Sequence, residues 1–251
     1  MKVIRANCRI QFTPQDIAFL LNTLDQHSKQ ETALQNLLAD PDSRTLLLDS
    51  DTIYEAIIDT PANLPISIHL YFYVLVRRVL RNAGIENEEL ADYVAELLAE
   101  FTRSESPTNQ TGNSNTKSLS LDAWIETLRG GNHRVRFEQK AHVANRLLFH
   151  TGIHEEWLRH RTERRGAPTL EFYESVGPMF YRDAGQHSLA KSYDLRLIFE
   201  QLSGRFHETR VALNELATRL LHFDSPSYPL VPSEITNPQE AQEPEAPPGC
   251  V

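Results

Sequence analysis

Residues 66–80 read ISIHLYFYVLVRRVL, and this stretch decides the fold class. Apolar side chains leave almost no polar face before Arg77 and Arg78, and Pro65 suits the start of a helix. A helix that is apolar nearly all round lies inside a protein core. The apolar run is well below the roughly 20 residues needed to cross a bilayer. We therefore expect a central core helix here and no segment that spans a membrane.

Helical patterns continue on both sides of this stretch. Thr13 and Pro14 are typical of a helix start, and residues 46–58 read as a single helix that stops before Pro61. A helical pattern around residues 34–38 ends before Pro41, because the residue before proline disfavours helical angles. A further helix is expected over residues 86–101. Five helices joined by short loops predict a bundle.

Other segments carry more specific expectations. Partial alternation over residues 3–12 favours a short strand or an extended arm. Residues 136–149 predict a helix that Gly152 ends as a left-handed cap. A segment that opens at Pro168 is expected to be interrupted at Gly177–Pro178. The apolar spacing over residues 198–220 predicts one continuous last helix, which Gly204 weakens only slightly.

Together these patterns predict an all-α protein, a bundle of about eight to ten helices. Residues 1–103 form an N-terminal helical half and residues 119–224 a C-terminal half, which we expect to share one core. Residues 104–118 hold no aliphatic or aromatic side chain and predict a flexible polar loop. Residues 225–251 are rich in Pro and Glu and predict a disordered acidic tail.

Composition indicates a cytoplasmic protein. The chain has two cysteines, Cys8 and Cys250, which is no framework for disulfides. Its first residues lack the apolar run of a secretory signal. The net charge of −9 and a pI near 5.6 do not fit a dedicated nucleic-acid-binding protein, whose domain pI usually exceeds about 9.

The charge is not evenly spread along the chain. Residues 129–165 carry nine Lys or Arg and four Glu, so this segment alone is basic, at +5. The basic segment favours a solvated pair of helices that complements the acidic N-terminal half. The alternative is a site for a phosphorylated or acidic ligand, with these arginines as its candidate residues: Arg159, Arg161, Arg164 and Arg165.

The same region is rich in histidine, which raises the possibility of a metal site. His150 and His154 are four residues apart, and Glu155 follows directly, so these three are the candidate ligands. A further ligand is expected from another helix, such as His187 or His207. The spacing matches neither the zinc protease motif nor the di-iron carboxylate motif. A histidine in the last turn of a helix is also stabilised by the helix dipole, so a structural role for His150 stays open.

No known catalytic motif occurs in the sequence. It lacks the nucleophile elbow, the dinucleotide fingerprint and the phosphate loop. We therefore expect a non-enzymatic helical interaction or regulatory protein whose partner is another protein, and which requires no cofactor. A metal-dependent enzyme and a binder of a phosphorylated ligand are the two alternatives. The oligomeric state is left open.

Overall fold

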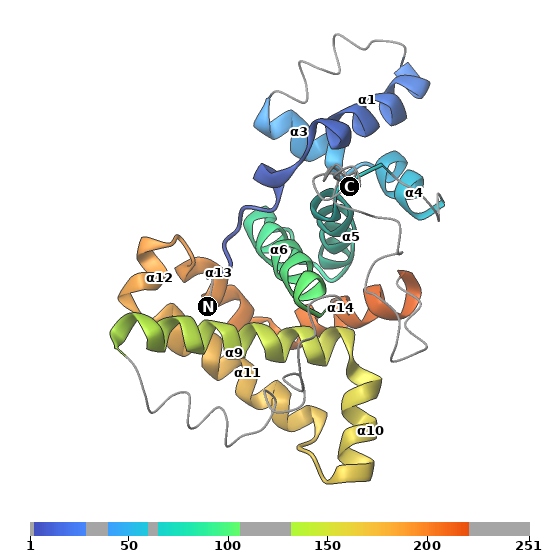
Figure 1. Ribbon diagram of the computed structural model, residues 1–251. Helices are drawn as coiled ribbons and strands as arrows, with labels where there is room; N and C mark the ends of the chain where they lie inside the picture. The colour runs from blue at the N-terminus through green and yellow to red at the C-terminus, as the bar shows by residue number, and fades with distance from the viewer. Residues whose placement is uncertain (1–2, 29–39, 60–64, 106–131, 221–251) are drawn as a thin grey trace, which may run out of the picture.

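The computed structural model describes residues 3–28, 40–59, 65–105 and 132–220. Within these ranges 81% of the residues are α-helical, in 11 α-helices of which all but α12 have seven or more residues, and no strand occurs (Figure 1). The predicted all-α bundle is confirmed. The pattern around residues 34–38, most of the predicted polar loop and the predicted tail lie outside the described residues.

In the described residues of the N-terminal half there are a 3₁₀ turn, η1, and five α-helices. They are η1 (Arg9–Gln11), α1 (Pro14–Ser28), α3 (Pro41–Leu48), α4 (Asp51–Asp59), α5 (Ile68–Asn82) and α6 (Glu88–Glu105). Thr13 caps α1 as expected, because its hydroxyl accepts a hydrogen bond from the Asp16 amide at 3.2 Å. The Asp16 carboxylate in turn accepts from the Ser67 amide at 2.6 Å and so fixes the start of α5 against α1.

Two expectations for this half need comment. Of the two alternatives for residues 3–12, the strand is not formed, and the segment is an arm with a 3₁₀ turn. Its polar groups bond to helix side chains instead, as the Arg9 amide does to the Asp92 carboxylate at 2.8 Å. Residues 46–58 are not one helix, because α3 begins at Pro41 and ends before Asp49. The Asp49 carboxylate is held there by two 2.8 Å bonds from the Arg77 guanidinium of α5.

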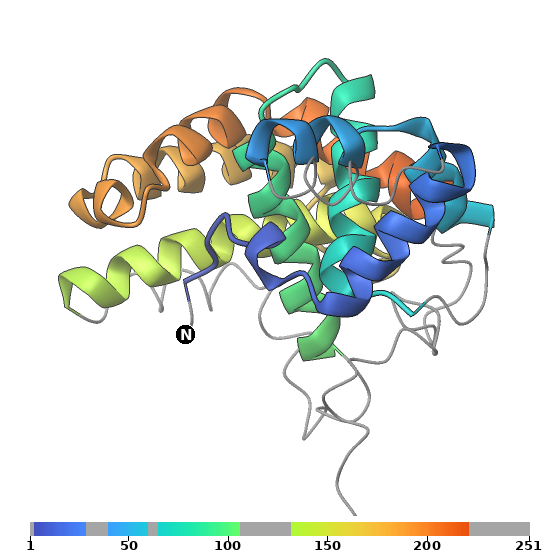
Figure 2. The ribbon, with the colours of Figure 1, turned by 90° about the horizontal axis from the view of Figure 1, so that it is seen from above.

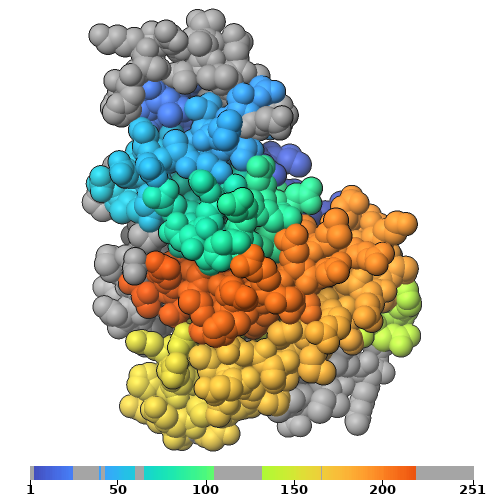
Figure 3. Space-filling view, turned by 180° about the vertical axis from the view of Figure 1, so that it is seen from behind, coloured from blue at the N-terminus to red at the C-terminus, as the bar shows by residue number. Residues whose placement is uncertain are grey.

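The C-terminal half forms six α-helices within residues 132–220, the part that the structure describes. They are α9 (His133–Ile153), α10 (Glu155–Arg165), α11 (Leu170–Gly185), α12 (Ser188–Ser192), α13 (Arg196–Gly204) and α14 (Phe206–Leu220). The three longest, α9, α11 and α14, pack against one another, and α13 packs on α11. Figure 3 shows α14 lying between the α5–α6 region on one side and α10 and α11 on the other.

Three expectations for this half were also wrong. Gly152 does not end a helix but lies inside α9, where its missing side chain lets Leu213 of α14 approach closely. Helix α11 runs through Gly177 and Pro178 without interruption, and the ring of Phe206 packs on Gly177. The predicted last helix is two helices, because the chain turns at Arg205 between α13 and α14.

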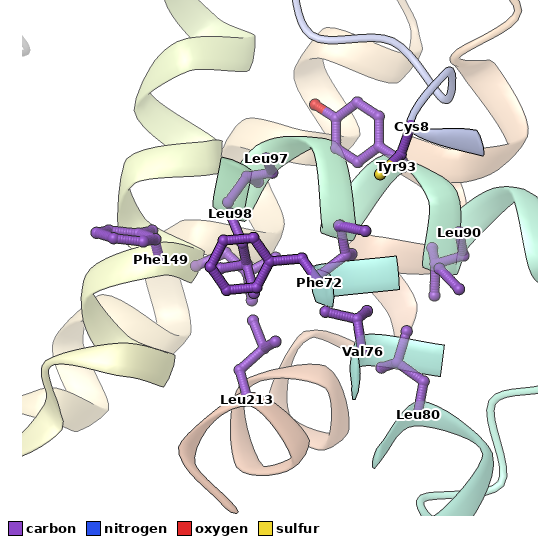
Figure 4. Packing of buried hydrophobic residues seen from close by; sticks show 14 of the residues in the cluster. Cys8, Phe72, Val76, Leu80, Leu90, Tyr93, Leu97, Leu98, Phe149 and Leu213 are labelled. Carbon is purple, nitrogen blue, oxygen red and sulfur yellow. The ribbon is translucent and has the colours of Figure 1, made fainter. Parts of the chain in front are cut away.

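The buried side chains of both halves belong to one hydrophobic cluster. Helix α5 packs against α6 within its own half and against α14 from the other. In Figure 4, Phe72 and Val76 of α5 lie between side chains of α6 and Leu213 of α14, with Phe149 of α9 beside them. The division of the chain into two halves remains a prediction.

Across the described ranges, no helix combines the length and the apolar character that crossing a membrane requires.

Candidate functional site

The residues predicted as metal ligands lie where α10 turns away from the end of α9 (Figure 1). His154 is the hinge between the two helices, with φ −115° and ψ 39°. His150 and His154 stand one turn apart, with 5.7 Å between their ring centroids. We define the α9–α10 corner as five side chains that gather at this turn: Arg146, His150, His154, Trp157 and Arg161.

His150 is the buried centre of the corner. This residue is only 5% exposed, and its ring stacks on Trp157 with 5.9 Å between centroids. Its Nε2 lies 3.4 Å from the Arg146 guanidinium. Because a guanidinium can only donate, Nε2 accepts, and the ring proton resides on Nδ1. The buried Nδ1 has no hydrogen-bond acceptor among the described residues.

The surroundings of His150 keep its imidazole neutral. Burial is the main cause that lowers the pKa of His150 well below its ordinary value, and His154, Arg146 and Arg161 lower it further. The charges that act on this histidine are therefore all basic. A negative charge placed near this ring would counter these basic groups and favour its protonated form.

Arg161 lies over the other aromatic group of the corner. Its guanidinium carbon is 4.7 Å from the centroid of the Trp157 ring, a cation–π contact. Its Nε and Nη1 are buried, and the part of the chain that the structure describes provides no hydrogen-bond acceptor for them. The Arg161 charge also acts on buried Tyr173 of α11, whose pKa is raised by burial and lowered in part by this arginine. Arg161 is thus a cation with two buried donors available.

Glu155, the predicted third metal ligand, has other partners. Its carboxylate accepts a 2.6 Å bond from Arg159 and a 2.5 Å bond from Arg210 of α14. Arg210 also pairs with Glu174, to which His207 is bonded at 3.0 Å. Partial burial raises the pKa of Glu155, but the bonds from Arg159 and Arg210 outweigh this and leave it lowered. The acidic groups near the corner are therefore already neutralised by arginines.

The structure thus separates the residues that the sequence grouped. Of the described side chains, no three or more His, Cys, Asp or Glu are placed to hold a metal ion. The ring of His187, one predicted further ligand, contacts His133 in a tilted arrangement with 3.8 Å between centroids and accepts a bond from the Leu189 amide. The metal site stays a prediction that would require the corner to rearrange.

The four predicted ligand-binding arginines also differ from one another. Arg161 is half-buried in the corner, whereas Arg159 and Arg164 are exposed on α10, and Arg159 is paired with Glu155. The side chain of Arg165 lies outside what the structure describes. Sequence reasoning did not single out Arg146 and Trp157. Their positions four residues before His150 and four before Arg161 are the signal that would have placed each pair on one helix face.

No protein-family model, no curated protein and no solved structure matches this chain. Function must therefore be inferred from the chemistry of the corner, which offers positive charge and buried N–H donors.

Proposed function

We propose that this protein is a non-enzymatic binding protein, with an interaction or regulatory role, that holds a phosphorylated or similarly acidic ligand at the α9–α10 corner. One observation carries this proposal. Within the described ranges, His150 Nδ1 and the Nε and Nη1 of Arg161 are buried N–H donors without acceptors, and the charged groups that act on His150 are all basic.

The energetics of these donors favour an anionic ligand. A buried donor without an acceptor costs about 1–3 kcal/mol, and native proteins contain few of them. A phosphate group offers several strong acceptor oxygens, and hydrogen bonds to a charged partner are about twice as strong as neutral ones. A ligand of this kind would satisfy the donors and offset the basic charge together.

The neighbouring electrostatics support the same ligand class. Glu155 and Glu174 are bound by Arg159 and Arg210, so they do not compensate the charge of Arg161. The wider segment 129–165 is basic in an otherwise acidic chain. Long-range attraction therefore concentrates anions near this part of the surface.

Calorimetric titration of the full chain with inorganic phosphate tests the proposal. The variant Arg161→Gln is expected to bind about tenfold or more weakly, a loss of about 1.4 kcal/mol or more. Arg164→Gln is the matched control, because it removes the same charge from an exposed position on the same helix. Its affinity is expected to stay within about twofold of the wild type, which is about 0.4 kcal/mol.

Two results would contradict the proposal. Equal weakening in Arg161→Gln and Arg164→Gln would show nonspecific attraction to the basic surface. Absence of phosphate binding by the wild-type chain at millimolar concentrations would show that the corner is a structural feature only.

A further inference from the structure

Helix α12 is the shortest α-helix that the structure describes, with five residues, and a histidine caps its start. The Nδ1 of His187 accepts a hydrogen bond from the Leu189 amide at 3.2 Å. An N-cap acceptor satisfies one of the amides that the first turn of a helix leaves unpaired. So short a helix has little stability of its own and depends on its cap and on packing. Neither residue belongs to the α9–α10 corner, so a role for this cap goes beyond the proposed function.

The cap lies against the start of α9. In Figures 1 and 2, α12 and the first turns of α9 lie at the same end of the molecule. The centroid of the His187 ring is 3.8 Å from that of His133 and 5.1 Å from that of buried Phe137. Phe137 also stacks on Tyr193, the C-cap of α12, with 5.8 Å between centroids. The residues at both ends of α12 therefore pack on the same part of α9.

The hydrogen bond at the cap defines which nitrogen of His187 carries the ring proton. Because Nδ1 accepts from an amide, the ring is neutral and its proton resides on Nε2. Nε2 is buried, and no described residue forms a hydrogen bond with it. A second proton would have to bind at Nδ1, where it would face the Leu189 amide, which is itself a donor. The cap can therefore form only with the neutral ring.

The charged groups around His187 also disfavour a protonated ring. His133, Lys140 and Arg136 of α9 act on it, and each of them is basic. Burial is the largest cause that lowers the pKa of His187, and these three groups lower it further, whereas the nearby His133 backbone raises it in part. The Asp183 carboxylate of neighbouring α11 is already bonded to Lys140 at 2.9 Å. A charged His187 ring would thus be repelled by the start of α9.

We propose that the His187 cap is an acid-sensitive latch, in which protonation of His187 releases α12 from α9 while the rest of the helical bundle stays folded. A proton taken from solvent binds Nδ1 and turns it into a donor, so the bond from the Leu189 amide breaks. The cationic ring then leaves the basic surface at the start of α9 and moves into water. Without its cap α12 loses its helical structure, and Phe137 becomes exposed.

The pH range of the latch follows from the direction of the pKa shift. In the closed latch the pKa of His187 lies below the ordinary value of about 6.5. The closed latch is therefore most stable above about pH 6.5 and loses stability as the pH falls below that value. The ratio of open to closed latch rises by up to about tenfold per pH unit, until the pKa of the closed form is reached.

Hydrogen exchange of the full chain tests the latch at about pH 7.5 and about pH 5.5, with labelling times scaled to the intrinsic exchange rate at each pH. Protection of residues 188–192 should be about fivefold or more lower at the acidic pH, and that of α5 should change by less than about twofold. His187→Asn keeps a side-chain oxygen that caps the helix but does not titrate, so its α12 should stay protected at both pH values. His160→Asn, at an exposed position on α10, is the matched control and should respond as the wild type does.

The latch is overturned if α12 is equally protected at both pH values, or if His187→Asn loses protection in acid as much as the wild type. Equal losses in α5 and α12 would overturn it as well, because the whole bundle would then be responding to acid. NMR of the His187 ring in the wild-type chain needs no variant. A ring that titrates while the Leu189 amide signal stays unchanged would also contradict the latch. Phosphate binding at the α9–α10 corner should be unchanged in His187→Asn, so failure here is separate from failure of the proposed function.

Discussion

His150 is a neutral donor in the free protein because of the groups around it. Burial and three basic neighbours disfavour its protonated form. A bound dianion favours that form, so the pKa of His150 must be higher in the complex than in the free protein. Anion binding is therefore linked to uptake of a proton, and affinity rises as pH falls through the window between the two pKa values.

Sulfate isolates this linkage, since it remains a dianion where phosphate titrates. We expect sulfate affinity to increase as pH is lowered from about 7.5 to 5.5, by up to about tenfold per pH unit. The variant His150→Gln should lose most of this dependence, whereas the control His160→Gln, at an exposed position on α10, should keep it. Calorimetry in buffers of different ionisation enthalpy measures the proton uptake directly. A flat pH profile in the wild type would remove His150 from the site.

Gly152 is the other residue whose surroundings define its role. A Cβ at this position would lie 2.7 Å from the Cβ of Leu213 and 3.4 Å from the Arg210 carbonyl oxygen. Neither atom is the end of a flexible side chain, so α14 itself would have to move. The glycine is required by close packing of two helices and not by a left-handed backbone.

Gly152→Ala is therefore expected to lower the free energy of unfolding by about 1–3 kcal/mol, the usual cost of overpacking. Gly204→Ala is the matched control, because no described residue has an atom within 4 Å of its added Cβ. That variant should be neutral or stabilise the fold by up to about 1 kcal/mol, because alanine lowers the conformational entropy of the unfolded chain. Urea unfolding followed by circular dichroism measures both. A neutral Gly152→Ala would show that α14 shifts at no cost.

At the level of elements, sequence patterns located helices better than they located helix ends. The core helix expected over residues 66–80 is α5, shifted by two residues, because its apolar residues specify burial directly. Two breaks were missed, after Leu48 and after Gly204. Each break lies at a residue with a long-range hydrogen bond to a distant part of the chain. At the first break, Asp49 accepts from Arg77; at the second, Arg205 donates to the Gly84 carbonyl oxygen. Local spacing does not encode such contacts.

Arg205 links the α13–α14 turn to the end of α5. Its guanidinium donates to the carbonyl oxygens of Gly84 at 2.8 Å and Ala83 at 3.2 Å, which lie beyond the last turn of that helix. We expect Arg205→Met, which keeps the aliphatic stem, to lower the free energy of unfolding by about 1–3 kcal/mol. The control Arg196→Met, exposed on α13, should change it by less than about 0.5 kcal/mol. Equal effects in chemical denaturation would show that the bonds of Arg205 add nothing to stability.

At the scale of the whole molecule, the candidate site shows what sequence alone can and cannot place. Charge and histidine density pointed to the region around residues 150–165, since composition is read directly from the chain. Composition could not show that Glu155 pairs with Arg210, because those residues are 55 positions apart and meet only through packing of α14. The contact between His133 and His187 was missed for the same reason, as it joins distant parts of the chain.

The packing of α14 against α5 leads to a prediction about cooperativity. Leu213 is fully buried in the cluster that joins both halves, so Leu213→Ala should lower the free energy of unfolding by about 2–5 kcal/mol. If the halves share one core, hydrogen exchange should show equal losses of protection in the most protected amides of α5 and of α9, because both exchange through global unfolding. The control Leu197→Ala, at a residue 66% exposed, should leave both unchanged. A loss confined to α9 and α14, with α5 unaffected, would mean that the two halves unfold as independent domains.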